Sequence, residues 1–279
     1  MSARRNAWRW WAGASALATI GYFLLPRDTA PQRLTFAAFG LVCAVAVVAG
    51  VRLHRPRRSG VWYFFAASGL TTTVANAIVA GYQEQHGNVP YPSTADLFYT
   101  LTYPMMAIGL LAMLRARQGR NVAGLLDAAM ATTAIGLAFW VFVLHPVAAG
   151  SGASVAQRIL GTEYPCWDVL LVALLARLYL GGTGRITTSD RLLGLAVTLL
   201  TAGDATFALV SLHHPAYGIC SLIWLPAYAL FAAAALHPSM SEAAGAARER
   251  DQARVGPARL ALLAASSLST RAASGPSRR

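Results

Sequence analysis

Long apolar runs separated by short polar connections dominate the chain. Eight of these runs approach the roughly 20 residues that a helix needs to cross a hydrocarbon core of about 30 Å. A backbone inside lipid has to pair its hydrogen-bonding groups within its own segment, and the runs lack the alternation of a membrane barrel. The pattern predicts an all-α, polytopic membrane bundle within residues 1–240, with about eight transmembrane helices near 8–25, 34–53, 61–82, 96–114, 122–147, 166–181, 192–212 and 219–236.

The arginines alternate between rich and poor connections. The amino terminus and every even-numbered connection are rich in arginine, and every odd-numbered connection is poor. Cytoplasmic loops are enriched in basic residues, so this asymmetry places the rich connections inside. It predicts that both termini are cytoplasmic and that the protein is a multi-pass protein of the inner (plasma) membrane.

The composition agrees with a lipid-embedded chain. Hydrophobic residues make up 56% of the 279 residues and charged residues 12%, whereas a soluble domain carries about 25% charge. The net charge is +12, and all 23 basic residues are arginine. Because these arginines lie between apolar runs and form no basic face, we expect the bilayer and not a nucleic acid as the partner.

Two connections share a motif that precedes an apolar run. Tyr91-Pro92 is followed by Asp96, and Tyr164-Pro165 is followed by Asp168. Proline is tolerated in the first turn of a helix, and an aspartate there complements the helix dipole. Each motif is therefore either a helix-start device or a functional acid. The repeat suggests that residues 61–236 form three successive helical hairpins.

Three segments carry a resemblance to a known family: PYPSTADLFYTLTYPMMAIGLLAMLR, YPCWDVLLVALLARLYLGG and AYALFAAAALHPSM. They resemble the multi-span sensor region that precedes GGDEF and EAL domains in actinobacterial cyclic di-GMP signalling proteins. The resemblance covers roughly residues 61–240. It implies a sensory role and a cytoplasmic GGDEF/EAL signalling partner.

The chain contains neither a GGDEF nor an EAL motif, so the resemblance implies no cyclase or phosphodiesterase activity. Residues 241–279 are expected to form a cytoplasmic polar tail. Their apolar run at 260–268 is about half the length of a span, and we expect a detached or truncated sensor part.

Asp204 is the leading candidate for chemistry, because an ionisable group within a span is costly and marks function by default. Asn76, Tyr103, Trp224 and Tyr228 are predicted at similar depths, where they would line a ligand pocket. Two prolines, at positions 104 and 226, are expected to break their helices near this level. The alternative is a structural lock, in which Asp204 bonds Asn76 or a threonine.

Histidine and cysteine offer weaker candidates. His86, His145, His213 and His214 are predicted on the outer side, but without metal-ligand spacing, so neither a metal nor a cofactor is expected. Cys166 and Cys220 are predicted near the outer face, where a disulfide is a further alternative.

The resemblance and the lack of catalytic motifs together favour a non-catalytic membrane sensor or regulatory module. A homodimer is possible as its assembly state. No motif of a phosphate-binding loop, a hydrolase or a zinc enzyme occurs in the chain. A small membrane transporter or permease is the second interpretation, because repeated hairpins, helix-breaking prolines and a mid-membrane acid suit that class as well.

Overall fold

The computed structural model describes residues 2–117, 154–180, 186–210 and 217–243, together with the single residues 130, 133, 136, 137 and 141. The helices in these ranges are α1 (Ser2–Leu24), α2 (Ala30–His54), α3 (Ser59–His86), α4 (Thr94–Arg117), α7 (Val155–Leu180), α8 (Thr188–Val210), α9 (Tyr217–Leu236) and α10 (Met240–Ala243). The described residues contain no strand, so this part of the chain is all-helical.

Six of these helices, α2, α3, α4, α7, α8 and α9, are long and apolar enough to cross a membrane. Large apolar side chains remain exposed on their outer faces, including Val42, Val45 and Leu97. An apolar surface of this kind suits lipid better than water. The structure thus indicates a membrane protein.

Two predicted segments lie wholly or mostly outside the described residues. They are the fifth span at 122–147, apart from five single positions, and the tail at 241–279 beyond residue 243. The first predicted span forms α1, but this helix is not among the six, because Arg9 and three tryptophans lower its mean hydropathy.

The helix starts follow side-chain capping. Ser93 and Asp96 cap α4, since the Ser93 backbone N–H donates to Asp96 Oδ2 over 2.6 Å. At α8 the Thr187 N–H donates to Asp190 Oδ2 over 2.7 Å. These are capping boxes, in which a polar residue and a partner three positions later satisfy free backbone donors. The helix-start interpretation of Asp96 is confirmed.

The sixth predicted span required correction. Helix α7 begins at Val155, eleven residues before the predicted start at Cys166. Its start is set by another capping box, in which the Ser154 N–H donates to Gln157 Oε1 over 2.8 Å and the Gln157 N–H donates to Ser154 Oγ over 3.3 Å. Pro165 and Asp168 therefore lie inside the helix, and the helix-start interpretation of this second motif was wrong.

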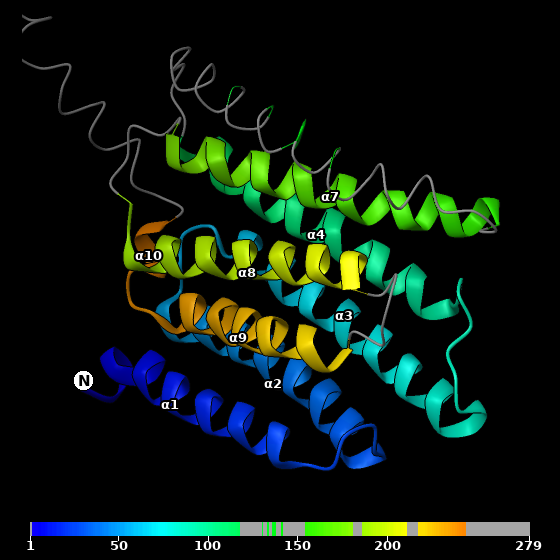
Figure 1. The fold of residues 1–279 in the computed structure, drawn as a ribbon. Helices are drawn as coiled ribbons and strands as arrows, with labels where there is room; N and C mark the ends of the chain where they lie inside the picture. Colours follow the sequence, from blue (N-terminus) through cyan, green and yellow to red (C-terminus); the bar gives the residue numbers. More distant parts are fainter. Residues whose placement is uncertain are drawn as a thin grey trace, which may run out of the picture.

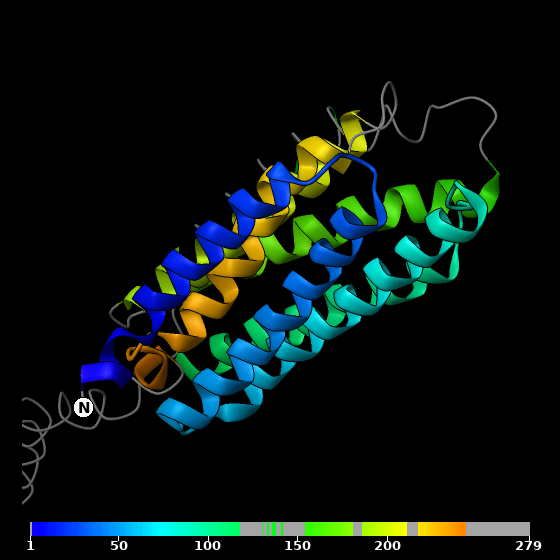
Figure 2. The same cartoon turned by 90° about the horizontal axis from the view of Figure 1, so that it is seen from below.

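The six apolar helices form a ring. Each contacts the next in the order α2, α3, α4, α7, α8, α9, and α9 packs back against α2 to close it. Figures 1 and 2 show these helices running alongside one another as a single bundle. The buried core lies inside the ring and includes Trp62, Met106, Leu171 and Leu225. Polar groups that face inward from different helices are brought together there.

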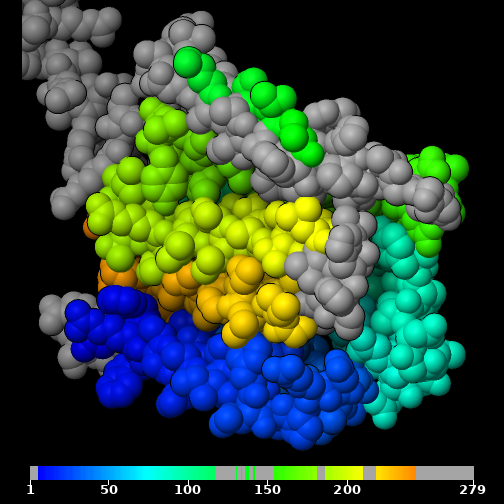
Figure 3. Space-filling view, in the orientation of Figure 1, coloured from blue at the N-terminus to red at the C-terminus, as the bar shows by residue number. Residues whose placement is uncertain are grey.

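Helix α1 lies outside this ring. It packs against α9 and α2, and the Trp11 indole donates to the Ala229 carbonyl over 2.9 Å. In the space-filling view, α1, α2, α8 and α9 form a continuous packed surface (Figure 3).

The amino terminus and the segment after α9 lie at the same end of the bundle, where Figure 1 draws N and α10. The ring centroids of Trp8 and His237 are 5.1 Å apart at this end. The opposite end holds the α1–α2 and α3–α4 connections. At this end the Arg33–Glu84 ion pair, 2.8 Å long, joins the first turn of α2 to the last turn of α3.

Candidate functional site

Asp204 lies near the carboxyl end of α8 and accepts hydrogen bonds from two neighbouring helices. The Tyr103 hydroxyl of α4 donates to Oδ2 over 3.0 Å, and the Trp224 indole of α9 donates to Oδ1 over 2.8 Å. Gly203 allows this arrangement, because a Cβ at that position would lie 2.6 Å from the Trp224 ring. Asp204 therefore joins three helices at one point, through partners other than the expected Asn76 or threonine.

Asp168 of α7 lies next to Asp204 of the neighbouring helix α8. The carboxyl groups of the two residues lie close enough to interact directly, and Asp168 is only 1% exposed. A hydrogen bond between two carboxyl groups requires a proton on one of them, because an ionised carboxylate can only accept. We call Asp168 and Asp204 the acid pair.

The acid pair has no cationic partner among the described residues. The described ion pair of the chain, Arg33–Glu84, lies at one end of the bundle. One carboxyl oxygen of Asp168, Oδ1, is buried without a hydrogen-bond partner in the described part of the chain. A buried oxygen without a partner lowers the stability of the folded protein by about 1–3 kcal/mol. Unsatisfied groups of this kind are often found at functional sites.

A cavity of about 60 Å³ adjoins the acid pair on the side of Asp204. We call it the acid cavity. All five residues singled out from the sequence line it: Asn76, Tyr103, Asp204, Trp224 and Tyr228. Its other lining residues are Thr72, Tyr99, Thr102 and Leu200. The structure thus brings together side chains from α3, α4, α8 and α9, and whether they bind a ligand stays a prediction.

Asn76 adds a second unsatisfied group to this cavity. The Tyr99 hydroxyl donates to Asn76 Oδ1 over 2.6 Å, whereas the amide nitrogen Nδ2 is buried without a partner among the described residues. Asn76 is 7% exposed. A water molecule or another acceptor in the cavity would satisfy this donor, and the volume is large enough for a few waters.

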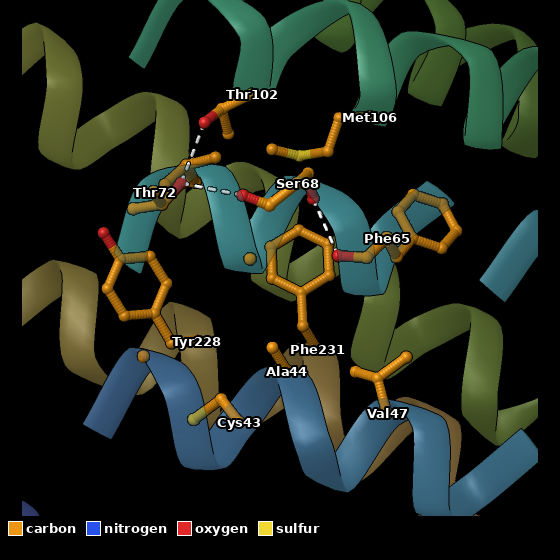
Figure 4. Close-up of a pocket in the computed structure, with 13 residues that line it drawn as sticks. Cys43, Ala44, Val47, Phe65, Ser68, Thr72, Thr102, Met106, Tyr228 and Phe231 are labelled. Atoms are coloured by element: carbon orange, nitrogen blue, oxygen red, sulfur yellow. Dashed lines mark hydrogen bonds between the residues drawn. The ribbon is translucent and has the colours of Figure 1, made fainter. Parts of the chain in front are cut away.

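A second cavity of about 40 Å³ continues along the axis of the ring and shares Thr72, Thr102, Leu200 and Tyr228 with the first. Figure 4 shows its largely apolar lining, with Cys43, Ala44 and Val47 on α2 opposite Thr72 and Thr102. The Thr72 and Thr102 hydroxyls are 3.0 Å apart. The polar side chains that line the two cavities thus lie mostly near the acid pair.

The sequence suggested that the two prolines near this level break their helices. This expectation was wrong, because both helices continue through them. Helix α4 runs through Pro104 and α9 runs through Pro226. Each proline lacks an N–H, so the carbonyls of Thr100 and Leu222 lose their usual helical donor.

Further polar groups lead from the acid pair toward one end of the bundle. The Tyr103 and Tyr164 ring centroids are 5.8 Å apart, and the Tyr164 hydroxyl donates to Asp96 Oδ1 over 3.0 Å. Just outside α4, burial and the negative charges of Asp96 and Glu163 raise the pKa of Tyr91 to about 12. Asp96 and Glu163 thus place negative charge close to Tyr91 at this end of the bundle.

A turn with several hydrogen bonds lies at the other end of the bundle. It is formed by Leu236-His237-Pro238-Ser239, which continue from the end of α9 and belong to one of the segments that resemble the sensor family. A ring nitrogen of His54, Nε2, lies 2.9 Å from the Leu236 carbonyl oxygen. The Ser189 N–H donates to Ser239 Oγ over 3.0 Å. Burial, and in second place the charge of His54, lowers the pKa of His237. We call residues 236–239 with these partners the His237 corner, which ties α2 and α8 to the end of α9.

The remaining candidates are only partly covered. Of the four histidines predicted on the outer side, His86 lies among the described residues and the other three lie outside them. Cys166 is exposed on α7 and Cys220 is buried on α9, and both are free thiols. The structure does not join them in a disulfide.

Sequence reasoning undervalued Asp168 and missed Thr72, Tyr99 and Thr102 as lining residues. The signal that could have separated Asp168 from Asp96 is Ser154-Val-Ala-Gln157, a capping box that starts α7 upstream of Pro165. Nothing local marks the threonines, because hydroxyls within spans commonly bond their own helix.

Comparisons with protein-family models, curated proteins and solved structures found no match to this chain.

Proposed function

We propose that this protein is a non-catalytic sensor or regulatory module of the inner membrane that receives its stimulus at the acid cavity. The observation that carries the proposal is the convergence of Asp204, Tyr103, Trp224, Tyr228 and Asn76 around one cavity inside the helix ring. Buried acids within spans mark functional sites by default, and polar groups lacking partners are what a ligand would satisfy.

The proposed topology has eight spans, with α1 and the segment at 122–147 added to the six apolar helices. Both termini are cytoplasmic in this topology. Two observations support it: the alternation of arginine between connections, and the position of the amino terminus beside the His237 corner. The acid cavity then lies in the half of the bundle that faces outward.

The proposed output runs through the His237 corner. A stimulus bound at Asp204 contacts α8 and α9, and both helices lead to this corner. A shift of α8 against α9 would alter the Ser189–Ser239 contact and so move the chain after residue 239. A ligand can drive such a shift only if it binds the two helix arrangements with different affinity. A cytoplasmic GGDEF/EAL protein would be the receiver, as the sequence resemblance implies.

The proposal is tested by appending a diguanylate cyclase reporter to the carboxyl terminus of the full chain and measuring cyclic di-GMP in cells. Asp204→Asn replaces the carboxyl group of the cavity with an amide of nearly the same shape. We expect it to change reporter output about fivefold or more, the lower range of a typical coupling energy.

The matched control is Asp28→Asn, the same substitution at an exposed position in the α1–α2 connection, where the left-handed backbone tolerates asparagine. It should leave the output unchanged. The sensor proposal is rejected if Asp204→Asn inserts and folds normally and gives wild-type output. Loss of folded protein in Asp204→Asn alone would instead favour the structural lock.

A transporter or permease is the second candidate, and the acid pair is the observation that favours it. Two buried carboxyls in contact, beside helices that contain prolines, resemble the mid-membrane ion sites of secondary transporters. Flux of protons or sodium ions in liposomes containing the purified protein would support this candidate, and tight liposomes would oppose it.

A further inference from the structure

The acid pair combines three features that no residue on its own explains: two carboxyls in contact, a buried oxygen with no partner among the described residues, and an adjoining polar cavity. We propose that Asp168 and Asp204 form a proton-binding site that takes up and releases one proton through the acid cavity. This inference rests on the proposed function in one respect, because it assumes that the stimulus arrives at the acid cavity. It identifies that stimulus as a proton.

The first step concerns charge balance. Two ionised carboxylates in contact within an apolar bundle would repel each other strongly. The donors to Asp204 are the neutral hydroxyl of Tyr103 and the neutral indole of Trp224, and neither acid forms an ion pair with a described residue. The charge that balances the pair therefore has to be brought in, and a proton shared between the carboxyls does this without further space.

The second step concerns the elements around the pair that the structure describes. The groups that face it from α3, α4, α7 and α9 are all neutral or acidic, with no arginine or histidine among the described ones. They are Asn76 on α3, Tyr99 and Tyr103 on α4, Tyr164 and Trp167 on α7, and Cys220, Trp224 and Tyr228 on α9.

The third step concerns water. The acid cavity is lined by hydroxyls, an amide and a carboxylate, and its volume of about 60 Å³ can hold a few water molecules. Asn76 Nδ2 is buried and needs an acceptor, which water supplies. Water next to Asp204 gives the proton a carrier to and from the carboxyl.

The proton balance is simple. A hydronium ion gives one proton to a carboxylate oxygen of the pair and becomes water, and release is the reverse, so nothing is oxidised or reduced. Tyr164 and Asp96 extend the polar groups from the pair toward the end of α4, which is the end proposed to face outward.

Loss of the proton would have a mechanical effect. The pair bridges α7 and α8, and a groove of about 560 Å³ lies between these helices further along. Two adjacent negative charges would push α7 and α8 apart, whereas a shared proton holds them together. The charge state of the pair thus biases the position of α8, which leads to the His237 corner.

The test uses the full chain in nanodiscs and two measurements. Dicyclohexylcarbodiimide modifies protonated carboxyls in apolar surroundings, and mass spectrometry locates the product. We expect modification of Asp168 or Asp204 that declines as the pH rises. Asp190 is the internal control, because it is equally buried but caps α8, where one of its carboxyl oxygens accepts hydrogen bonds from both the N–H and the hydroxyl of Thr187. It should stay unmodified.

Infrared spectroscopy gives the second measurement, which does not depend on reagent access. The wild-type protein should have a protonated-carboxyl band that titrates with pH. Asp168→Asn and Asp204→Asn should each remove it, because an asparagine amide can donate to the remaining carboxylate without a bound proton. Asp28→Asn should retain it. The inference is overturned if the wild-type spectrum has no such band, or if the band survives in either pair variant.

The two proposals can fail separately. If the protonated-carboxyl band titrates but the output of the cyclase reporter does not change with pH, the proton-binding site is supported and the sensor proposal is rejected. A reporter that responds to Asp204→Asn without any protonated-carboxyl band would preserve the sensor and reject the proton as its ligand.

Discussion

Asp96 and Asp168 occur in the same sequence motif but have different roles in the structure. Asp96 caps the first turn of α4 and accepts from Ser93 and Tyr164. Asp168 lies inside α7, 1% exposed, against Asp204. The motif itself cannot distinguish the two, because an aspartate after Tyr-Pro suits both positions. The difference arises from where each helix begins, which is decided by residues upstream of the motif.

Asp204 could be found from the sequence alone, because an acid in an apolar run is conspicuous and costly. Its hydrogen-bond partners could not. Tyr103 and Trp224 are 101 and 20 residues away in the chain, and aromatic residues with a polar atom are common in this sequence. Their contact with Asp204 depends on the packing of α4 and α9 against α8.

His237 supports a pH prediction at this scale. Its pKa is lowered in the folded protein by burial, so the unfolded chain binds a proton at higher pH than the folded one. The stabilising effect of neutral His237 is therefore complete above about pH 6.5, the unfolded value, and declines as the pH falls through the folded value. We expect the thermal melting temperature in detergent to fall on acidification over this window.

The comparison variant is His237→Asn, whose side-chain oxygen can still accept the N–H of Ser239, as His237 Nδ1 does over 3.1 Å. It should show a smaller decline in melting temperature than the wild type between pH 7.5 and 5.5. An identical decline in both proteins would contradict the assignment to His237.

At the scale of the helices, apolar run length predicted most elements well. The bounds of α2, α3, α4, α8 and α9 differ from the predicted spans by a few residues. The larger difference, in α7, arose because its first turns carry Gln157, Arg158 and Glu163, which break the apolar run without breaking the helix. A hydropathy pattern shows which residues are apolar enough to lie in lipid. The residue at which a helix begins is set instead by side-chain capping and by the helix propensity of the first turns.

Close approach between helices is a property that hydropathy does not report. A Cβ on Gly50 of α2 would overlap the Ala235 carbonyl oxygen of α9. Small residues allow backbones in membrane bundles to approach in this way. The α2–α9 contact closes the helix ring, so Gly50 has a structural role that no motif marks.

Gly50→Ala should therefore destabilise the protein by about 1–3 kcal/mol, the usual cost of overpacking. The obstructing atom belongs to the backbone and cannot rotate away. The matched control is Gly81→Ala on α3, where a Cβ meets nothing within 4 Å. Thermal unfolding in detergent should show a lower melting temperature for Gly50→Ala and no decrease for Gly81→Ala. Equal stability of the two variants would disprove the close contact.

At the scale of the whole molecule, ring closure creates the interior that contains the acid cavity. Its lining comes from α3, α4, α8 and α9, so no pair of neighbouring helices could form it. The sequence placed the five candidate residues at similar depths by counting along each span. It could not show that their helices surround a common space.

The orientation of the whole bundle can be tested by cysteine labelling in intact spheroplasts with a membrane-impermeant maleimide. Exposed Cys166 is first replaced by serine, and Cys43 and Cys220 are buried. Asn88→Cys, in the exposed α3–α4 connection, should react from outside. Glu242→Cys, beyond the His237 corner, should react only after permeabilisation, because the arginine-rich connections stay inside.

The controls are the Cys166→Ser parent protein, which should not be labelled, and detergent-solubilised protein, in which both introduced cysteines should react. Labelling of Glu242→Cys from outside, or of Asn88→Cys only after permeabilisation, would reverse the proposed topology.

The sequence by itself determined that lipid surrounds most of this chain, that its long segments are helices, and that a buried acid lies in one of them. These properties follow from run length and from the cost of unpaired polar groups in hydrocarbon, which are local. The tertiary structure alone decided that Asp168 meets Asp204 and that α9 closes a ring against α2. Such contacts depend on which helix faces pack together, and helices far apart in the chain acquire neighbours only when the bundle assembles.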